Sequence, residues 1–144
     1  MHRRQFLAVG SAALASLVVP WGCANPGQRR AARIAASTAG RVAKGSQLRL
    51  AIVGVANQGG SNLGAVQHER IVALCDVDAG YLSAAAARFP EAKTFVDFRE
   101  LLSDDSLDLD GVVISTPDHT HAPAAAMALR NGLPTYLEKP LTHT

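Results

Sequence analysis

Residues 54–59 form a glycine-containing turn whose chemistry would be the binding of phosphate groups. They read Gly-Val-Ala-Asn-Gln-Gly, a G-x-A-x-x-G pattern, and follow directly after a short apolar run. Gly54 permits a tight turn, Ala56 places only a small side chain beside a ligand, and Gly59 or Gly60 lets the next helix begin close to the turn. The N–H groups at such a helix start favour anions. The pattern predicts a pyrophosphate-binding turn, although an ordinary strand-to-helix turn can have the same composition.

Asp76 is the acidic residue that such a turn requires. It closes the second apolar run, about 20 residues after the glycine turn, which is the spacing of the dinucleotide-binding fingerprint. Its carboxylate would accept hydrogen bonds from the ribose hydroxyls of an adenosine and would repel a 2′-phosphate, which favours NAD over NADP. Asp78 is near enough to share this task. A plain surface carboxylate and an S-adenosylmethionine methyltransferase, which also combines a glycine turn with an acidic second strand, stay open as alternatives.

Two later loops carry the remaining candidates for chemistry. Residues 115–121 read Ser-Thr-Pro-Asp-His-Thr-His, residues 138–141 read Glu-Lys-Pro-Leu, and each loop follows an apolar run. Lys139, beside the carboxylate of Glu138, could have its proton affinity tuned for acid–base catalysis. The alternative is a solvent-facing lysine that is paired with the neighbouring carboxylate.

The two loops together resemble those of the Gfo/Idh/MocA family of oxidoreductases, over residues 48–144. The resemblance rests on a T-P-x-x-x-H turn after the fourth strand and an E-K-P sequence after the fifth. It implies hydride transfer between a nicotinamide cofactor and a carbon that bears a hydroxyl group, on a sugar or cyclitol. It also implies that Lys139 is the catalytic residue, which polarises the substrate hydroxyl and moves its proton, and that the Lys139–Pro140 peptide bond is cis.

The same resemblance places Thr116, Pro117 and His121 on the nicotinamide side of the cofactor. The candidate cofactor-binding residues are Gly54, Ala56, Asn57, Gln58, Gly59, Asp76, Thr116, Pro117, His121, Glu138, Lys139 and Pro140. His119, His121 and His143 could suggest a metal ion, but their spacing fixes no third ligand, so no metal is expected. In the simplest reading His119 is exposed and His121 forms a local hydrogen bond at a helix start.

The elements that must position these residues alternate between strands and helices. Apolar runs predict strands at 48–53, 70–75, 94–96, 110–115 and 134–138. Helices are predicted at 79–88 with Asp78 as N-cap, from Asp97 through 102, and at 122–131 with Pro123 in the first turn. Short links between such elements require parallel strands and right-handed crossovers. The predicted fold class is α/β, a doubly wound parallel sheet of the Rossmann-like NAD(P)-binding type.

The first 47 residues read as a leader and a linker. Arg3 and Arg4 with Phe6 and Leu7 resemble a twin-arginine export motif, and an apolar stretch of about 14 residues follows, too short for a comfortable membrane span. We expect a signal peptide at 1–24, a flexible linker at 25–47 and the Rossmann domain at 48–144. Export by the twin-arginine route would deliver the protein to the periplasm. Cys23 offers lipid attachment, and hence a membrane tether, as an alternative.

Charge is divided unevenly along the chain and bears on possible partners. Residues 1–46 carry seven basic side chains and no acidic ones, whereas residues 47–144 carry seven basic and twelve acidic ones, so +7 and −5 sum to the net +2. The predicted domain is therefore acidic, which gives no electrostatic reason to expect nucleic acid as a partner. The two cysteines form no disulfide framework, and Cys75 reads as a small core residue.

The resemblance implies a second domain that supplies substrate contacts and the oligomer interface. The 144 residues do not include such a C-terminal substrate domain, so we expect the chain alone to be an incomplete enzyme that binds a cofactor weakly at most. The expected partners are a sugar-like substrate and the twin-arginine export machinery, and the full-length protein is expected to be a homo-oligomer. An NAD-dependent glycosidase of the same family and a non-catalytic dinucleotide-binding module stay open as alternatives.

Overall fold

The computed structural model describes residues 46–141 and resolves them into alternating strands and helices. In chain order these are β1 (Arg49–Val53), α2 (Gln58–Ala65), β2 (Arg70–Cys75), α3 (Ala79–Arg88), β3 (Lys93–Phe95), α4 (Phe98–Ser103), the 3-10 helix η1 (Asp105–Leu107), β4 (Gly111–Ile114), α5 (Asp118–Arg130) and β5 (Thr135–Leu137). The predicted signal peptide, nearly all of the linker and His143 lie outside the described residues. Within residues 46–141 no helix is long and apolar enough to cross a membrane.

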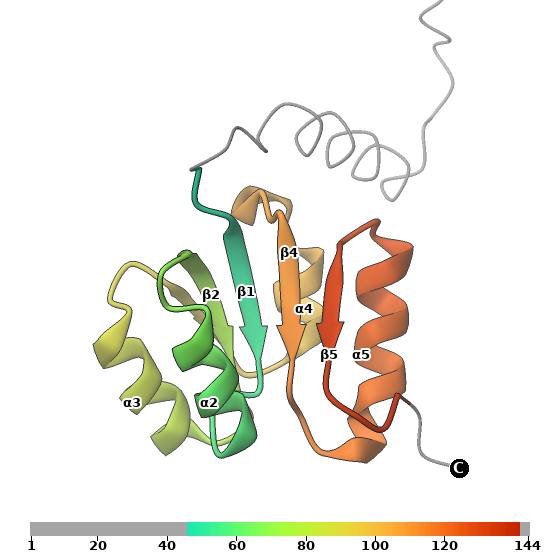
Figure 1. Cartoon of the computed structure of the whole chain (residues 1–144), viewed down its shortest axis with the longest axis horizontal. Coiled ribbons are helices and arrows are strands. Elements are labelled where there is room, and N and C mark those ends of the chain that lie inside the picture. The colour runs from blue at the N-terminus through green and yellow to red at the C-terminus, as the bar shows by residue number, and fades with distance from the viewer. Residues whose placement is uncertain (1–45, 142–144) are drawn as a thin grey trace, which may run out of the picture.

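The five strands form one sheet in the order β3-β2-β1-β4-β5, and every neighbouring pair is parallel. The helices α2 and α3 lie over one face of this sheet, whereas α4 and α5 lie over the other (Figure 1). The predicted doubly wound parallel sheet is therefore confirmed. Because β1 pairs with both β2 and β4, the chain reverses its winding direction beside β1, and open α/β sheets bind ligands at this point.

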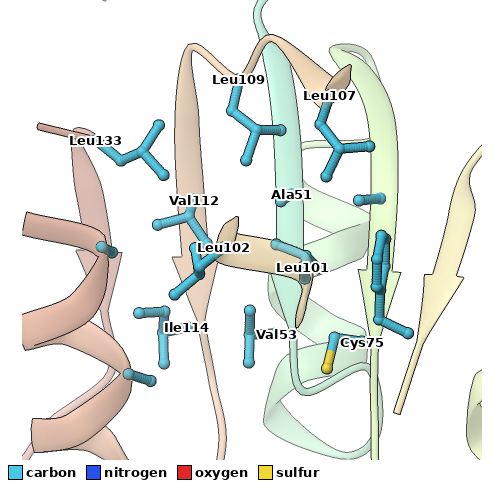
Figure 2. Packing of buried hydrophobic residues seen from close by; sticks show 14 of the residues in the cluster. Ala51, Val53, Cys75, Leu101, Leu102, Leu107, Leu109, Val112, Ile114 and Leu133 are labelled. Atoms are coloured by element: carbon cyan, nitrogen blue, oxygen red, sulfur yellow. The ribbon is translucent and has the colours of Figure 1, made fainter. Parts of the chain in front are cut away.

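Apolar side chains on both faces of the sheet explain why the strand sequences are almost continuously hydrophobic. Along β1, Leu50 and Ile52 belong to the core shared with α2 and α3, and Ala51 and Val53 to the core shared with α4 and α5. In the latter core, Leu101 and Leu102 of α4 are fully buried against the middle strands (Figure 2). Burial of such a leucine side chain contributes roughly 1.5–3 kcal/mol, so these two cores hold the strands in place.

Two of the helix starts follow the sequence prediction. The Asp78 side chain accepts hydrogen bonds from the N–H groups of Gly80 and Tyr81 and so caps α3. Asp97 accepts one from the N–H of Arg99 at the start of α4. Each carboxylate satisfies N–H groups that have no partner within the first turn of a helix.

The prediction for the last helix was wrong at its start. The expected helix began at residue 122, but α5 begins at Asp118 and contains Pro123 in its interior. Pro117 precedes the helix, and the Thr120 hydroxyl donates to the Pro117 carbonyl at 2.8 Å, which stabilises an earlier first turn. Pro123 costs the helix one N–H donor, and packing of the following alanines against the sheet offsets that loss.

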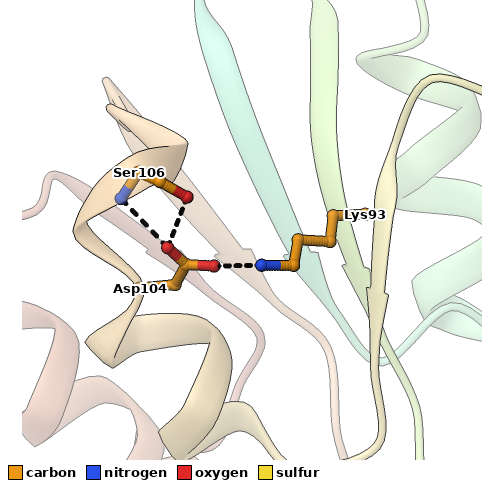
Figure 3. Close-up of polar contacts among 3 residues, drawn as sticks. All are labelled: Lys93, Asp104 and Ser106. Carbon is orange, nitrogen blue, oxygen red and sulfur yellow. Dashed lines mark hydrogen bonds and ion pairs between the residues drawn. The ribbon is translucent and has the colours of Figure 1, made fainter.

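The segment between α4 and β4 contains a 3-10 turn that the sequence analysis did not predict. Asp104 ends α4 and accepts hydrogen bonds from the backbone and the hydroxyl of Ser106, which fold η1. The Lys93 ammonium of β3 forms an ion pair with the same carboxylate (Figure 3). Asp104 thereby links a strand at the edge of the sheet to the segment that leads into β4.

Candidate functional site

The predicted site residues lie along one edge of the sheet. Gly54 follows β1, Asp76 follows β2, Thr116 follows β4 and Lys139 follows β5. Since all five strands are parallel, these positions share the carboxyl edge, which is the lower edge of the sheet in Figure 1. The expectation that Gly54, Asp76 and Lys139 occupy the same edge is confirmed.

The glycines of the turn are required by close backbone contacts. Gly54 has a φ of +89°, and a Cβ atom there would lie 2.6 Å from the Ser115 carbonyl oxygen. A Cβ on Gly59 would lie 2.1 Å from the carbonyl oxygen of Gly54. Neither distance can be reached by a real side chain, so α2 can begin directly against the turn only with glycine at both positions.

Asn57 precedes α2 in a backbone conformation that non-glycine residues rarely adopt. Its φ is 49° and its ψ is −117°, and its side chain forms no capping hydrogen bond. The first N–H groups of a helix have no partner within the helix, and here no side chain caps them. Gly60 donates to the carbonyl oxygen of Ala56, so within the described residues the N–H groups of Gln58 and Gly59 are the ones at the start of α2 that an anionic ligand in the adjacent cleft could use.

Asp76 ties the glycine turn to the end of β2. One carboxylate oxygen accepts a hydrogen bond from the Val55 N–H at 2.9 Å, and the other accepts one from the Asp78 N–H at 3.0 Å. A carboxylate can accept about four hydrogen bonds, so these two contacts leave acceptor capacity toward the cleft. The sequence analysis predicted a ligand contact for Asp76 but did not predict this support of the turn.

A cleft of about 780 Å³ lies along the carboxyl ends of the strands. Of the twelve candidate cofactor-binding residues, those that line it are Gly54, Ala56, Asn57, Gln58, Asp76, Thr116 and Pro117. Gly59 packs behind the turn instead, and His121 is buried, only 1% exposed. Glu138, Lys139 and Pro140 follow the neighbouring strand β5 and do not line this cleft.

Glu138 faces α2 and the end of β4. Its carboxylate accepts hydrogen bonds from the side chains of Asn62 at 2.9 Å, Gln58 at 3.3 Å and Tyr136 at 3.2 Å. The hydrogen bond from Asn62, followed by those from Tyr136 and Gln58, lowers the pKa of Glu138 below its usual value. The hydrogen bond that the Tyr136 hydroxyl donates to the Glu138 carboxylate raises the pKa of Tyr136.

Lys139 is exposed, and its ammonium forms no ion pair with Glu138 within residues 46–141. The structure therefore gives no support to the alternative of a lysine paired with its neighbouring carboxylate. The Lys139–Pro140 peptide bond is cis, as the family resemblance implied.

Sequence reasoning missed Asn62 and part of the cleft wall. The Asn62 amide donates to the Ser115 hydroxyl at 2.8 Å as well as to Glu138, and so joins α2 to the ends of β4 and β5. The far end of the cleft is lined by Tyr81, Val96, Asp97, Phe98 and Arg99. Residues 96–99 follow β3, and this place could have indicated a contact with the cleft because that strand ends at the same edge, whereas Tyr81 belongs to α3. None of these residues belongs to a recognisable binding motif.

The cleft fits a dinucleotide on three structural observations. The glycine turn provides a surface that a Cβ atom would block, and the uncapped start of α2 adjoins it. The Thr116 hydroxyl is buried and has no hydrogen-bond partner within the described part of the chain. A ligand hydroxyl or amide at this end of the cleft would satisfy it. Residues 46–141 contain no group of three or more metal-ligating side chains.

Comparisons with known proteins agree on one family. Residues 48–144 match the model of an oxidoreductase family with an NAD-binding Rossmann fold, GFO_IDH_MocA. An inositol 2-dehydrogenase from Saccharopolyspora erythraea is 34% identical over 102 residues, which are 67% of this chain and 30% of that protein. A glycosyl hydrolase family 109 protein from a Shewanella strain is 29% identical over 160 residues, covering all of this chain and 34% of that protein.

Solved structures show the same likeness. The scyllo-inositol dehydrogenase of Lactobacillus casei, determined with NAD(H) and scyllo-inositol, aligns with a TM-score of 0.61 at 25% identity and covers 69% of this chain and 30% of that one. The chain thus spans about a third of the length of the relatives it matches. From the glycine turn, the acidic end of β2 and the two loops after β4 and β5, together with these matches, we conclude that the chain belongs to the Gfo/Idh/MocA oxidoreductase family and provides its NAD-binding Rossmann domain.

Proposed function

We propose that the protein transfers hydride between NAD and a hydroxyl-bearing carbon of a cyclitol or sugar. The observation that carries this proposal is the cleft at the carboxyl edge, which has the glycine turn and Asp76 on its wall and Lys139 on the neighbouring loop. The inositol dehydrogenases among its relatives favour an alcohol as the substrate. They also favour dehydrogenase chemistry over the glycosidase alternative.

The wall of the cleft supports a division of tasks along the dinucleotide. The glycine turn and the N–H groups at the start of α2 would hold the pyrophosphate, and Asp76 would hold the adenosine ribose. Thr116 and Pro117 would contact the nicotinamide half. When bound, the nicotinamide supplies the site that accepts or donates hydride.

Lys139 is the residue we propose as the acid–base catalyst. Its exposed amine lies on the loop after β5 and has no ion pair within residues 46–141. A proton must leave the substrate hydroxyl as its carbon loses hydride, and the lysine amine would accept that proton. In the reverse direction the ammonium would return the proton to the carbonyl oxygen.

The first test measures cofactor binding by the 144-residue chain. Fluorescence is recorded while the chain is titrated with NADH. We expect saturable binding of NADH and weaker binding of NADPH, because the Asp76 carboxylate repels a 2′-phosphate. Asp76→Asn should weaken NADH binding by roughly 1–3 kcal/mol. The same variant should show a smaller difference between its affinities for NADH and NADPH than the parent does. Glu91→Gln, which removes an exposed carboxylate outside the cleft, serves as the control.

Two results would contradict the proposed cofactor site. Binding of S-adenosylmethionine without binding of NADH would assign the cleft to another ligand class. An Asp76→Asn variant that binds NADH as tightly as the parent would remove Asp76 from the ribose contact.

The role of Lys139 is tested by separating binding from chemistry. Lys139→Met should leave the NADH affinity of the chain within about threefold of the parent, since no phosphate contact is lost. In a full-length protein that oxidises a cyclitol or sugar, the same substitution should lower kcat by about 10²-fold or more. An unchanged kcat would exclude Lys139 as the catalyst, and a stop codon directly after residue 144 would favour a non-catalytic binding module.

Export and assembly are further proposals that depend on the sequence and the family resemblance. Arg3 and Arg4 support export by the twin-arginine route to the periplasm, and Cys23 leaves a lipid tether as the alternative. Replacing both arginines by lysine should leave the protein in the cytoplasmic fraction; unchanged periplasmic recovery would contradict the route. The proposed homo-oligomer is tested by light scattering on the full-length protein.

A further inference from the structure

His121 is the only buried polar or charged residue in the part of the chain that the structure describes. It belongs to the first turns of α5, and its side chain is 1% exposed. A buried imidazole must satisfy its ring nitrogens within the protein, because an unpaired polar group in the interior costs free energy. The partners of His121 therefore show what this side chain does.

Both ring nitrogens of His121 meet backbone carbonyl groups from different loops. Nε2 lies 2.7 Å from the carbonyl oxygen of Thr116, which follows β4. Nδ1 lies 2.7 Å from the carbonyl oxygen of Pro140, which follows β5. A carbonyl oxygen can only accept, and a neutral imidazole carries a single N–H. Each neutral tautomer therefore donates to one of the two carbonyl groups, and only the doubly protonated ring donates to both at once. The imidazole thus spans the space between the two loops that carry the candidate chemistry.

The sequence analysis assigned His121 to the nicotinamide side of the cofactor, and in the structure its side chain is buried and does not line the cleft. The cleft is lined by Thr116, Pro117, His119 and Thr120, but not by His121, which lies behind them. Its contacts reach the peptide groups beside two candidate functional positions, the Thr116 hydroxyl, which has no hydrogen-bond partner within residues 46–141, and the Lys139 amine. His121 is placed to act through these two residues.

We propose that His121 is a positioning residue that fixes the loop at 115–117 relative to the loop at 138–141. This proposal rests on the proposed function for its effect on catalysis. By holding the Pro140 carbonyl, the imidazole sets the direction from which Lys139 approaches the cleft. By holding the Thr116 carbonyl, it orients the side chain that meets the cofactor. Displacement of a catalytic group by about 1 Å can lower a rate about 10²-fold, so such a link has a catalytic consequence.

Three substitutions separate the two halves of this link. The amide of Asn reaches the position of Nδ1, and His121→Asn should keep the contact to Pro140. The longer amide of Gln reaches the position of Nε2, and His121→Gln should keep the contact to Thr116. His121→Phe fills the same space with a ring that cannot donate. His68→Asn, at an exposed histidine outside the cleft, is the matched control.

The readout is the set of backbone amide signals of the ¹⁵N-labelled 144-residue chain without cofactor. We expect His121→Phe to shift the signals of both loops, and His121→Asn to restore those of Lys139 and Leu141. His121→Gln should instead restore those of Ser115 and Thr116. If the Phe variant does not fold, the Asn and Gln variants still test the proposal, because each should restore the amide signals of a different loop. Both loops unchanged in His121→Phe, or identical patterns for Asn and Gln, would overturn the proposal.

Titration with NADH then separates this inference from the proposed function. His121→Gln should bind NADH within about threefold of the parent, and His121→Asn about tenfold more weakly, because only the Gln variant keeps the Thr116 loop in place. The reverse order of affinities would contradict the assigned contacts. A parent chain that binds no NADH would refute the proposed function, whereas the amide signals would still decide whether His121 links the two loops.

Discussion

At the scale of single residues, the site depends on side chains that serve the backbone as much as the ligand. Asp76 holds the N–H groups of Val55 and Asp78, and His121 contacts the carbonyl groups of Thr116 and Pro140. Such contacts keep loops of irregular structure in one conformation. A loop that is fixed before the ligand arrives loses less conformational entropy on binding.

Cys75 illustrates how burial controls reactivity beside the cleft. The thiol ends β2, is 3% exposed, and its burial, with the nearby carboxylates of Asp76, Asp97 and Glu100, raises its pKa to about 12. Thiolate is the reactive form of cysteine, so very little of it is present near neutral pH.

We therefore predict that Cys75 resists alkylation in the folded chain. Iodoacetamide at about pH 8 should leave its peptide unmodified under native conditions and modify it fully in guanidinium chloride, as mass spectrometry of the digested chain would show. Peptide mapping distinguishes Cys75 from Cys23. Rapid native labelling of Cys75 would mean that the end of β2 opens readily to solvent.

At the scale of elements, α2 is the helix whose placement decides whether the cleft exists. Its first turn lies against the glycine turn, and Asn62 in its middle reaches the ends of β4 and β5. The two glycines at 59 and 64 belong to the same helix but meet different surroundings. Alanine at these two positions therefore distinguishes the effect of tight packing on stability from the effect of helix propensity.

Gly59→Ala and Gly64→Ala should have opposite effects on stability. The new Cβ atom at 59 would lie 2.1 Å from the Gly54 carbonyl oxygen, whereas the one at 64 would meet nothing within 4 Å. Gly64→Ala should stabilise the chain by about 0.5–1 kcal/mol through helix propensity. Gly59→Ala should destabilise it by about 1–3 kcal/mol through overpacking and weaken NADH binding.

Denaturation by urea measures both changes in the free energy of unfolding. Two variants that are equally stable would show that α2 does not pack against the glycine turn as the structure has it. A Gly59→Ala variant with parental NADH affinity would separate the helix start from the phosphate site.

At the scale of the whole molecule, acidic side chains connect the outer elements to the sheet. Hydrogen bonds and the ion pair with Lys93 lower the pKa of Asp104 to about 2, first through Lys93 and then through Ser106. The Arg99 N–H lowers the pKa of Asp97, and Asn62 lowers that of Glu138. All three carboxyl groups are more acidic in the folded chain than in the unfolded one.

The folded chain should therefore lose stability in acid. A carboxyl group with a lowered folded-state pKa contributes its stabilisation above its unfolded pKa, about 4, and that contribution is lost as the pH falls through the folded pKa. For Asp104 the loss falls between about pH 4 and pH 2. Because Lys93 is 58% exposed, solvent screening limits the pair to roughly 1 kcal/mol or less.

Thermal unfolding between about pH 7 and pH 2 measures this effect, with Asp104→Asn as the informative variant. The variant should be less stable than the parent at neutral pH and should approach it as the pH falls. A difference that stays constant with pH would show that the Asp104 charge does not support the fold.

The sequence by itself determined the fold class, the alternation of strands and α-helices, and the family. Periodic apolar runs and capping residues such as Asp78 are local signals, and the glycine turn and the E-K-P loop are short motifs whose meaning depends on neighbours along the chain. These signals can be recognised in the sequence because the apolar pattern of an element and its capping residue are set by residues a few positions apart. The start of α5 was missed, because Pro123 dominated the local pattern while the actual first turn depends on residues 117–120.

Only the tertiary structure decided how the loops meet. The approach of Gly59 to Gly54, the contacts of Asn62 with Ser115 and Glu138, and the position of His121 between two carbonyl groups join residues that the sequence keeps apart. Such contacts arise when parallel strands place their carboxyl ends side by side, and no local pattern records them. The order of the strands in the sheet sets those neighbours, and packing of both faces of the sheet by helices fixes that order.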